Sequence, residues 1–402
     1  MKLNAIAVLI IRCLSAGLGF IITAEVTNNL NQSEVGIYFY LLSFIAVMSA
    51  LTSFGLNNIV LREVASNSIY ANEILNTSIL MIIIGALISL PIAYVFLLNE
   101  ELTEYGFVIG VILSIALINL ISHALQGIGR AKQAIFFGGV CFQFIYLLLV
   151  TTVNSSTLIE FLGFYILSYI STLVIIIALW IKVSGFKFAI DKNYKPYLKA
   201  AFPLIAFQLF QEINMAIGQL SLGIMDYKNE LAIYAVCFKI STLIGFIGFA
   251  INRVYSPEFA KANAGNDRVK LQQLILKARN FSVVTATPII ILACLFAEPL
   301  LSFFGQEYIQ YSWYLQLALI AQVLTLLNGT LAYFMIMCGF ETIYKNQIIF
   351  SCLFSFSFAY LLIDVAPLII ALVAFVFIQL WPLIFSIRFI QRELNIQYLK
   401  RK

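Results

Sequence analysis

Apolar residues run through the chain in twelve long stretches that are separated by short polar segments. At about 1.5 Å per helical residue, stretches of roughly 18 to 26 residues reach across a hydrocarbon core of about 30 Å. They are apolar on all sides, which favours helices over the alternating strands of a barrel. The expected membrane spans are residues 5–30, 35–56, 75–98, 105–125, 134–153, 158–181, 200–224, 231–252, 281–304, 313–338, 346–363 and 367–390.

The seventh stretch carries a stripe of polar residues. Gln208, Gln211, Glu212 and Gln219 fall at i, i+3, i+4 and i+11, which places them on one face of a helix. Glu212 lies near the middle of the span, where a carboxylate costs about 2.5–3.5 kcal/mol on insertion scales. We therefore expect this face to meet protein or a water-filled cavity and to carry function.

The two halves of the chain contain related segments. Residues 33–38, Ser-Glu-Val-Gly-Ile-Tyr, match residues 229–234, Asn-Glu-Leu-Ala-Ile-Tyr, at an offset of 196. Residues 54–57 match residues 249–252 at an offset of 195. Six predicted helices separate the copies, an even number, so both halves run in the same sense, as in a parallel repeat.

This repeat predicts an all-α membrane protein of two six-helix bundles. The bundles are residues 1–185 and 186–402, the second ending in a short cytoplasmic tail. A Lys-rich connector at 182–199 joins them. At the repeat offset, Gln208 is the counterpart of Arg12, so both helices are expected to line the cleft between the halves.

Composition and charge agree with a membrane location. The 402 residues are 62% hydrophobic and 11% charged, with a mean hydropathy of +0.98, whereas soluble domains carry about 25% charged residues. Lys and Arg gather in alternate loops, which predicts that both termini lie in the cytoplasm. The net charge of +5 is therefore a topology signal and requires no nucleic-acid partner.

Metal and enzyme chemistry have little support in the sequence. The six cysteines lie in apolar stretches without a CxxC pair, and the single histidine, His123, has no ligand partner at metal spacing. The Gly-rich residues 126–130 lack the GxxxxGK[ST] pattern of a nucleotide site. Because the predicted loops are too short for a catalytic domain, we expect no metal, no cofactor and no catalytic residue.

Several motifs then point to a family. They are residues 30–38, Leu-Asn-Gln-Ser-Glu-Val-Gly-Ile-Tyr, followed by 54–56, Phe-Gly-Leu, then 62–63, Arg-Glu, and the degenerate copy at 230–234. They resemble the O-antigen flippase (Wzx-like) group of the multidrug/oligosaccharidyl-lipid/polysaccharide (MOP) exporter superfamily, and the resemblance covers essentially the whole chain. It implies a V-shaped, alternating-access pair of bundles around a cationic cavity. It also implies transfer of an undecaprenyl-pyrophosphate-linked oligosaccharide from the cytoplasmic to the periplasmic leaflet of a bacterial inner membrane.

Four cations are candidates for binding that pyrophosphate. Lys239 and Arg253 fall on one face of the eighth span, fourteen residues or about 21 Å apart. The hypothesis is that Arg12 and Lys239 hold the pyrophosphate. Arg62 and Arg253 would attract it at the cytoplasmic mouth. The alternatives are snorkelling or a structural ion pair for the first two residues, and ordinary positive-inside topology for the other two.

Glu212 has three interpretations. It is a proton- or sodium-coupling carboxylate, or it hydrogen-bonds sugar hydroxyls together with the three glutamines of its stripe. The third interpretation is a counter-charge for Lys239 or Arg12.

Two rival functions remain open. A cation-coupled multidrug exporter of the same superfamily would favour carboxylates over cations in the cleft. A membrane enzyme of polysaccharide assembly, a polymerase or ligase, would need sizeable outer loops, which the sequence does not predict. For a flippase, the candidate partners are the lipid-linked oligosaccharide, inner-membrane lipids, a polysaccharide polymerase and a chain-length regulator.

Overall fold

The computed structural model describes residues 2–96, 106–107, 109–153, 156–185, 195–394, 396 and 398. Within these ranges all regular secondary structure is helical, and ten helical segments are long and apolar enough to span a membrane. Of the two other predicted spans, 200–224 falls within α9 (Lys195–Ile224), and 346–363 falls within α15 (Glu341–Leu362) except for its last residue. The all-α membrane class predicted from the sequence is confirmed.

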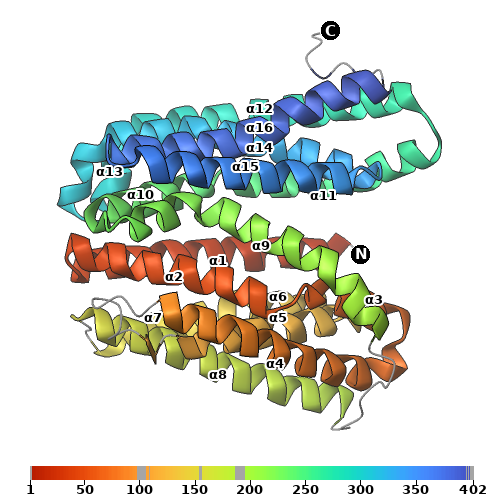
Figure 1. Cartoon of the computed structure of the whole chain (residues 1–402), viewed down its shortest axis with the longest axis horizontal. Helices are drawn as coiled ribbons and strands as arrows, with labels where there is room; N and C mark the ends of the chain where they lie inside the picture. Colours follow the sequence, from red (N-terminus) through yellow and green to blue (C-terminus); the bar gives the residue numbers. More distant parts are fainter. Residues whose placement is uncertain are drawn as a thin grey trace. The chain divides into compact units, whose positions relative to one another are not determined.

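Packing divides the chain into two units, residues 1–212 and 213–402. The division falls inside α9, whereas the sequence predicts a boundary at 185/186, next to residues 186–194, which lie outside the described residues. That boundary stays a prediction. The first unit also contains α1 (Lys2–Asn29), α2 (Gln32–Thr52), α3 (Leu56–Ser66), η1 (Ser68–Tyr70), α4 (Ala71–Phe96), α5 (Gly110–Gly127), α6 (Ala131–Ile135), η3 (Phe136–Val140), α7 (Cys141–Val153) and α8 (Leu158–Ser184), and its long helices run side by side (Figure 1).

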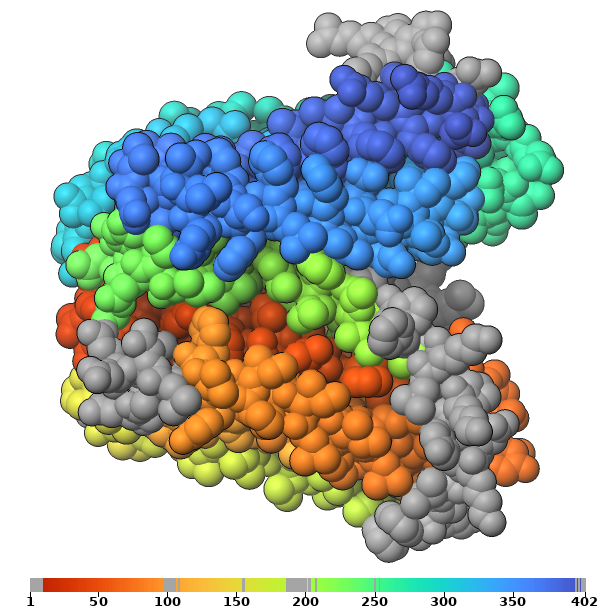
Figure 2. All heavy atoms as spheres, viewed as in Figure 1, coloured from red at the N-terminus to blue at the C-terminus, as the bar shows by residue number. Residues whose placement is uncertain are grey.

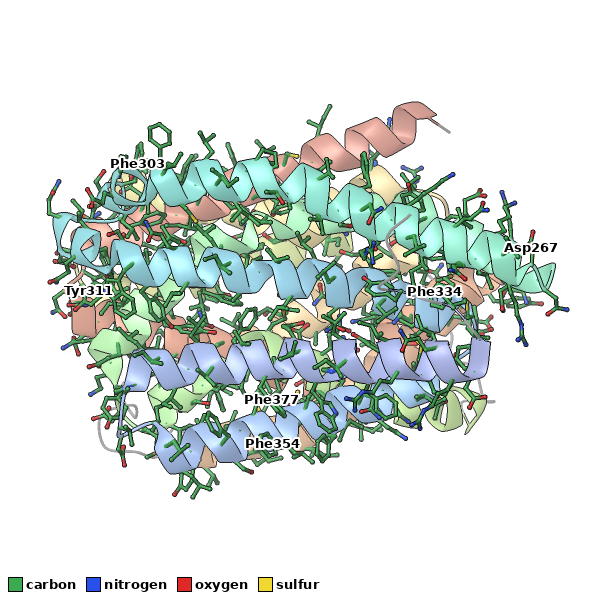
Figure 3. All side chains as sticks on the ribbon, turned by 90° about the horizontal axis from the view of Figure 1, so that it is seen from above. Asp267, Phe303, Tyr311, Phe334, Phe354 and Phe377 are labelled. Atoms are coloured by element: carbon green, nitrogen blue, oxygen red, sulfur yellow. The ribbon has the colours of Figure 1, made fainter. Side chains whose placement is uncertain are left out.

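The second unit is a bundle of antiparallel helices. In Figure 3, Asp267 marks the start of α12 at one end, while Phe303 and Tyr311 lie at the opposite end, between α12 and α14. Phe354 of α15 stacks on Phe377 of α16, with 4.4 Å between ring centroids. The elements are α10 (Lys228–Thr242), α11 (Gly245–Ala264), α12 (Arg268–Leu295), α13 (Ala297–Ser302), η4 (Gln306–Tyr311), α14 (Ser312–Met337), α15, and α16 (Pro367–Leu394).

Large apolar side chains cover the outer face of α4. Ile84 and Leu87 are 54% and 71% exposed, and neighbouring Ile88 and Ile92 are about half exposed. Figure 2 shows this helix, in orange, along the visible surface of the first unit. Such a continuous apolar surface requires lipid as its solvent.

The eighth predicted span is not one helix. Leu243, Ile244, Phe246 and Ile247 donate their backbone N–H groups to the third residue before them, which forms a tight turn between α10 and α11. The hydroxyls of the preceding residues, Ser241 and Thr242, bond back to main-chain carbonyls and compete with the regular helix. The helix expected over 231–252 is therefore interrupted after Thr242. That Lys239 and Arg253 share a face stays a prediction, because the side chain of Arg253 lies outside the described residues.

The internal repeat is visible in the helix starts. α2 begins at Gln32 and α10 begins at Lys228, at the offset of 196 found in the sequence. Each is followed by a short turn and a second helix, α3 or α11. The α2 copy starts with a capping box, in which Asn31 and Glu34 satisfy each other's backbone N–H groups.

Small residues let α4 approach α2 closely. A Cβ atom added at Gly85 would lie 2.5 Å from the backbone oxygen of Thr52. One helical turn further on, the buried hydroxyls of Ser89 and Thr52 are 2.5 Å apart. Gly85 and Ser89 form the small-residue spacing that brings membrane helices together. Gly55, with φ of +69°, packs against the α9 backbone at Ala201 and Ile205, which explains why the first part of α9 groups with the first unit.

A chain of buried amides joins four helices of the second unit. Gln379 of α16 donates to Asn214 Oδ1 of α9 and accepts from Asn328 Nδ2 of α14, both at 3.0 Å. Tyr344 of α15 donates to Asn328 Oδ1 at 3.2 Å. Each amide therefore depends on its neighbours, because hydrocarbon offers no other partner.

Replacing Gln379 with leucine is expected to destabilise the protein. The change leaves an acceptor on Asn214 and a donor on Asn328 buried without partners, at a cost on the order of 2 kcal/mol. The measurement is thermal unfolding of the purified protein in detergent. Gln391→Leu, at an exposed position on the same helix, is the matched control. Equal melting temperatures for the two variants would contradict the role of the amide chain.

Candidate functional site

Two residues of the polar stripe on α9 line an interior pocket of the first unit. Gln208 and Glu212 meet Asn119 of α5 and Tyr165 and Tyr169 of α8 around a cavity of about 200 Å³, here called the tyrosine pocket. The remaining wall comes from α2 and the residue after it, including Ser49 and Ser53. The sequence expectation that Glu212 faces protein or a cavity is met within this unit.

The aromatic side of this pocket is held by a cluster of rings. Phe142 stacks on Tyr169 with 4.3 Å between centroids, and Tyr165 packs edge-on against Tyr169 at 4.9 Å. Behind them, the hydroxyls of Tyr38 and Tyr146 lie 3.0 Å apart. Because rings from α2, α7 and α8 support one another, the pocket wall is fixed in place.

Glu212 is half-buried and forms no ion pair with another described residue of the first unit. A counter-charge within this unit therefore does not explain it. Its polar neighbours in the pocket are the hydroxyl and amide groups of serine, tyrosine, asparagine and glutamine side chains, which hydrogen-bond a ligand rather than neutralise a charge.

Arg12 lines a second cavity of the first unit, here called the arginine pocket, with a volume of about 240 Å³. Ser122 and His123 of α5 form the facing wall, together with Asn119 and Gln126. These four residues fall at i, i+3, i+4 and i+7 along α5. Asn119 lines both pockets, so the two cavities are neighbours.

The third wall of the arginine pocket is a π-helical turn, η3, within the single span of residues 131–153. π-turns widen a helix locally and often occur at functional sites. Gly138 and Gly139 face the pocket, and a Cβ atom at Gly138 would lie 3.0 Å from Ser122 Oγ. The glycines therefore keep the cavity open.

Gln143 orders the edge of this pocket. One of the two terminal atoms of its side-chain amide lies 2.8 Å from Ser15 Oγ. The same atom lies 3.0 Å from the carbonyl oxygen of Gly139 and 3.1 Å from that of Ser15. A position beside two carbonyls carries the NH2 group, since carbonyls only accept. Gln143 thus donates to Ser15, and the Ser15 hydroxyl hydrogen is left to point elsewhere.

Among the described side chains, four other predicted site residues line neither pocket, and they are Arg62, Gln211, Gln219 and Lys239. Arg62 is 68% exposed on α3 and pairs with the adjacent Glu63 at 2.9 Å. Gln211 is exposed on α9, and Gln219 and Lys239 are half-buried in the second unit. The side chain of Arg253 lies outside the described residues. Among the described residues, no three His, Cys, Asp or Glu side chains gather closely enough to hold a metal ion.

Sequence reasoning missed Tyr165, Tyr169, Asn119 and His123. The signal for α5 was present, because Asn119, Ser122, His123 and Gln126 form the same kind of helical stripe as the α9 residues. The two tyrosines carry no comparable signal, since aromatic residues also face lipid.

The fold and the polar interior define a class of protein. The structure matches an inward-facing multidrug resistance MATE family transporter of the MOP superfamily with a TM-score of 0.76, 16% identity, and coverage of 95% of this chain and 94% of that one. A MOP superfamily transporter from Pyrococcus furiosus, described by a reversed polarity of its binding pocket, matches with a TM-score of 0.68, 17% identity, and coverage of 97% and 95%. The chain therefore has the fold of these multi-pass membrane transporters.

Comparison of the sequence with family models identifies the family. Residues 2–263 match the family described as polysaccharide biosynthesis protein, so the chain belongs to that family. Residues 203–361 match a second family, MatE. No match was found among curated proteins. The predicted membership of the superfamily is confirmed.

Proposed function

We propose that the protein flips an undecaprenyl-pyrophosphate-linked oligosaccharide, an O-antigen repeat unit, from the cytoplasmic to the periplasmic leaflet of a bacterial inner membrane. The observation that supports this proposal is the arginine pocket. It combines Arg12 with hydroxyl and amide donors, and no Asp or Glu is among its lining residues. A cationic, donor-rich cavity suits a phosphorylated head group.

The chemistry of the proposed step is binding and transfer without bond breaking. A pyrophosphate and its sugars cannot enter hydrocarbon unaided, because each loses its hydration there. A fixed guanidinium and oriented hydroxyls replace that hydration and lower the barrier. No catalytic residue and no cofactor are required.

The tyrosine pocket suits the sugar part of the same substrate. Ring faces of Tyr165 and Tyr169 can pack on the apolar side of a pyranose, while Gln208, Asn119 and Glu212 hydrogen-bond its hydroxyls. The two pockets share Asn119, so a head group with a phosphate and an adjacent sugar would contact both.

A second candidate function is export of organic cations. The placement of Glu212 beside two tyrosines favours it, because a carboxylate with aromatic faces attracts a cation. The match of residues 203–361 to the MatE family agrees.

One transport experiment separates the two functions. The purified full-length protein is placed in vesicles with a fluorescent undecaprenyl-pyrophosphate-linked oligosaccharide, and flipping is read as protection from an impermeant lectin. The same vesicles are tested for uptake of ethidium. We expect the lipid-linked oligosaccharide to move and ethidium to remain outside. Ethidium uptake without flipping would overturn the proposal and establish the exporter.

Glu212→Gln is expected to reduce the dependence of flipping on a proton gradient while leaving substrate binding intact. The amide keeps the shape and hydrogen bonds of the carboxylate but cannot exchange a proton. Flipping is measured with and without an imposed pH gradient. Met215→Ala, at an exposed position three residues further along α9, is the control. An unchanged gradient dependence in Glu212→Gln would assign coupling to another group.

The remaining predicted contacts are retained within this proposal. Lys239 would hold substrate from the second unit, while Arg62 and Arg253 would attract it from the cytoplasm. Gln211 and Gln219 would hydrogen-bond sugar. Both termini would lie in the cytoplasm, and a polysaccharide polymerase and a chain-length regulator would act on the delivered product.

A further inference from the structure

We propose that the arginine pocket binds a phosphate group together with one proton, which His123 takes up as the anion enters. This inference deepens the proposed function, and rests on it for the identity of the natural substrate. It gives the transporter a means of proton-linked substrate capture at a residue separate from Glu212.

The orientation of the His123 ring is fixed by a hydrogen bond. Its Nδ1 lies 2.7 Å from the carbonyl oxygen of Asn119, one helical turn earlier on α5. A carbonyl oxygen only accepts, so Nδ1 must carry the hydrogen. In the neutral ring, the other nitrogen, Nε2, is then a bare acceptor.

This orientation decides what His123 can bind. Phosphate oxygens are acceptors, so they are repelled by a bare Nε2 and attracted by a protonated one. With Nδ1 already engaged, the ring can donate a hydrogen bond to an ionised anion oxygen only as an imidazolium. Anion binding and protonation of His123 are therefore a single linked event.

The rest of the pocket supplies donors suited to the same anion. Arg12 provides a guanidinium, and Ser122, only 7% exposed, has a hydroxyl without a hydrogen-bond partner among the described residues. The Ser15 hydroxyl hydrogen is also available, since Gln143 donates to its oxygen. The absence of a Cβ atom at Gly138 leaves room beside Ser122.

The surrounding charges determine the direction of the linkage. Among the described residues that line the pocket, Arg12 is the one charged side chain, and an entering anion balances the positive charge that a protonated His123 adds beside it. Glu212, Tyr165 and Tyr169 line the neighbouring pocket instead. The helices that pack against α5 also carry charged groups, and none of those described lines the arginine pocket. These groups are Glu34 of α2, the Arg62–Glu63 pair of α3, Glu73 of α4, Lys132 of α6, and Glu160 and Lys182 of α8.

The linkage has a defined consequence for affinity. If one proton binds with each anion, affinity for a non-titrating anion falls about tenfold per pH unit wherever free His123 is neutral. Sulfate is such a probe, because it keeps its charge across this range. Inorganic pyrophosphate is the probe closer to the proposed head group.

The experiment uses the fact that His123 is the single histidine of the chain. Full-length protein labelled with ¹⁵N in its imidazole and purified without a histidine tag gives one pair of ring signals. Without an added anion, at about pH 7.5, which is above the ordinary titration range of histidine, we expect a protonated Nδ1 and a bare Nε2. Saturating sulfate or pyrophosphate should shift the Nε2 signal to that of a protonated nitrogen. A Nε2 that stays bare at saturation would overturn the proposal.

Two variants sharpen the result. His123→Gln offers an amide donor without titration, so its affinity for sulfate should change less than about twofold per pH unit, against about tenfold in the unaltered protein. Arg12→Ala should abolish the anion-dependent shift of the His123 signal. Each variant is used only if its melting temperature matches that of the unaltered protein. If one of them fails this criterion, Ser122→Ala takes its place, because it leaves the His123 ring and the Arg12 guanidinium unchanged. It should weaken binding and retain the pH dependence.

The outcome is separable from the proposed function. Flipping of the lipid-linked oligosaccharide with no protonation of His123 would overturn this inference and support the function. If His123 becomes protonated when pyrophosphate binds but the lipid-linked oligosaccharide is not flipped, the result would support the anion site and overturn the proposed function.

Discussion

Replacing Arg12 with alanine is expected to slow flipping of the lipid-linked oligosaccharide at least tenfold. Hydrogen bonds to charged groups contribute about 1.5–3 kcal/mol each, and about 1.4 kcal/mol corresponds to a factor of ten. The effect is large because Arg12 faces a cavity in which water cannot fully replace it. The initial rate of flipping in vesicles measures it.

Two further variants define the Arg12 result. Arg12→Lys should keep part of the activity, since it retains the charge but loses the planar pair of donors. Lys261→Ala removes a cation that is 72% exposed on α11 and should flip at the parental rate. A folded Arg12→Ala protein with the parental rate would remove the arginine pocket from the transport pathway.

Gly85→Val is expected to have the largest effect on folding. The added Cβ would lie 2.5 Å from the Thr52 carbonyl oxygen, and the two methyl groups would add further overlap. A backbone atom cannot rotate away, so α4 must separate from α2 and the Thr52–Ser89 contact must break. We expect a loss of about 3 kcal/mol and much less folded protein in the membrane.

Gly163→Val is the matched control for this change. Gly163 also lies inside a helix of the first unit, α8, but a Cβ atom added there meets nothing within 4 Å. Both variants carry the same cost of a β-branched residue in a helix. Equal melting temperatures in detergent would show that the α2–α4 contact does not limit stability.

Much of the fold could be predicted from the sequence, because the bilayer imposes a simple rule. Long apolar stretches must be helices, and the repeat between residues 33–38 and 229–234 fixed the matching starts of α2 and α10. The turn after Thr242 could not be predicted in this way. Its flanking residues are as apolar as a continuous span, and the break depends on hydroxyl contacts with the local backbone.

The candidate site was predicted in part. The stripe containing Gln208 and Glu212 did locate a pocket wall, because helical periodicity is a local property. The residues that line a pocket together with Arg12 could not be predicted, because they come from α5 and η3, more than a hundred residues away in the chain. The sequence shows that His123 has no ligand partner at metal spacing, but it does not show the hydrogen bond between the His123 ring and a main-chain carbonyl, because that bond does not depend on the type of the neighbouring residue.

The π-helical turn at Phe136–Val140 makes the arginine pocket dependent on one inserted residue. A π-turn holds one residue more than the α-helical path between the same ends, and each residue rotates a helix by about 100°. Deleting a single codon there would turn Gly138 away from Ser122 of α5 and Gly139 away from Ser15 of α1, and would close the cavity. Within a family that shares this architecture, gain or loss of the cavity beside Arg12 is thus one mutational event, and the pocket lining can diverge while the scaffold stays the same.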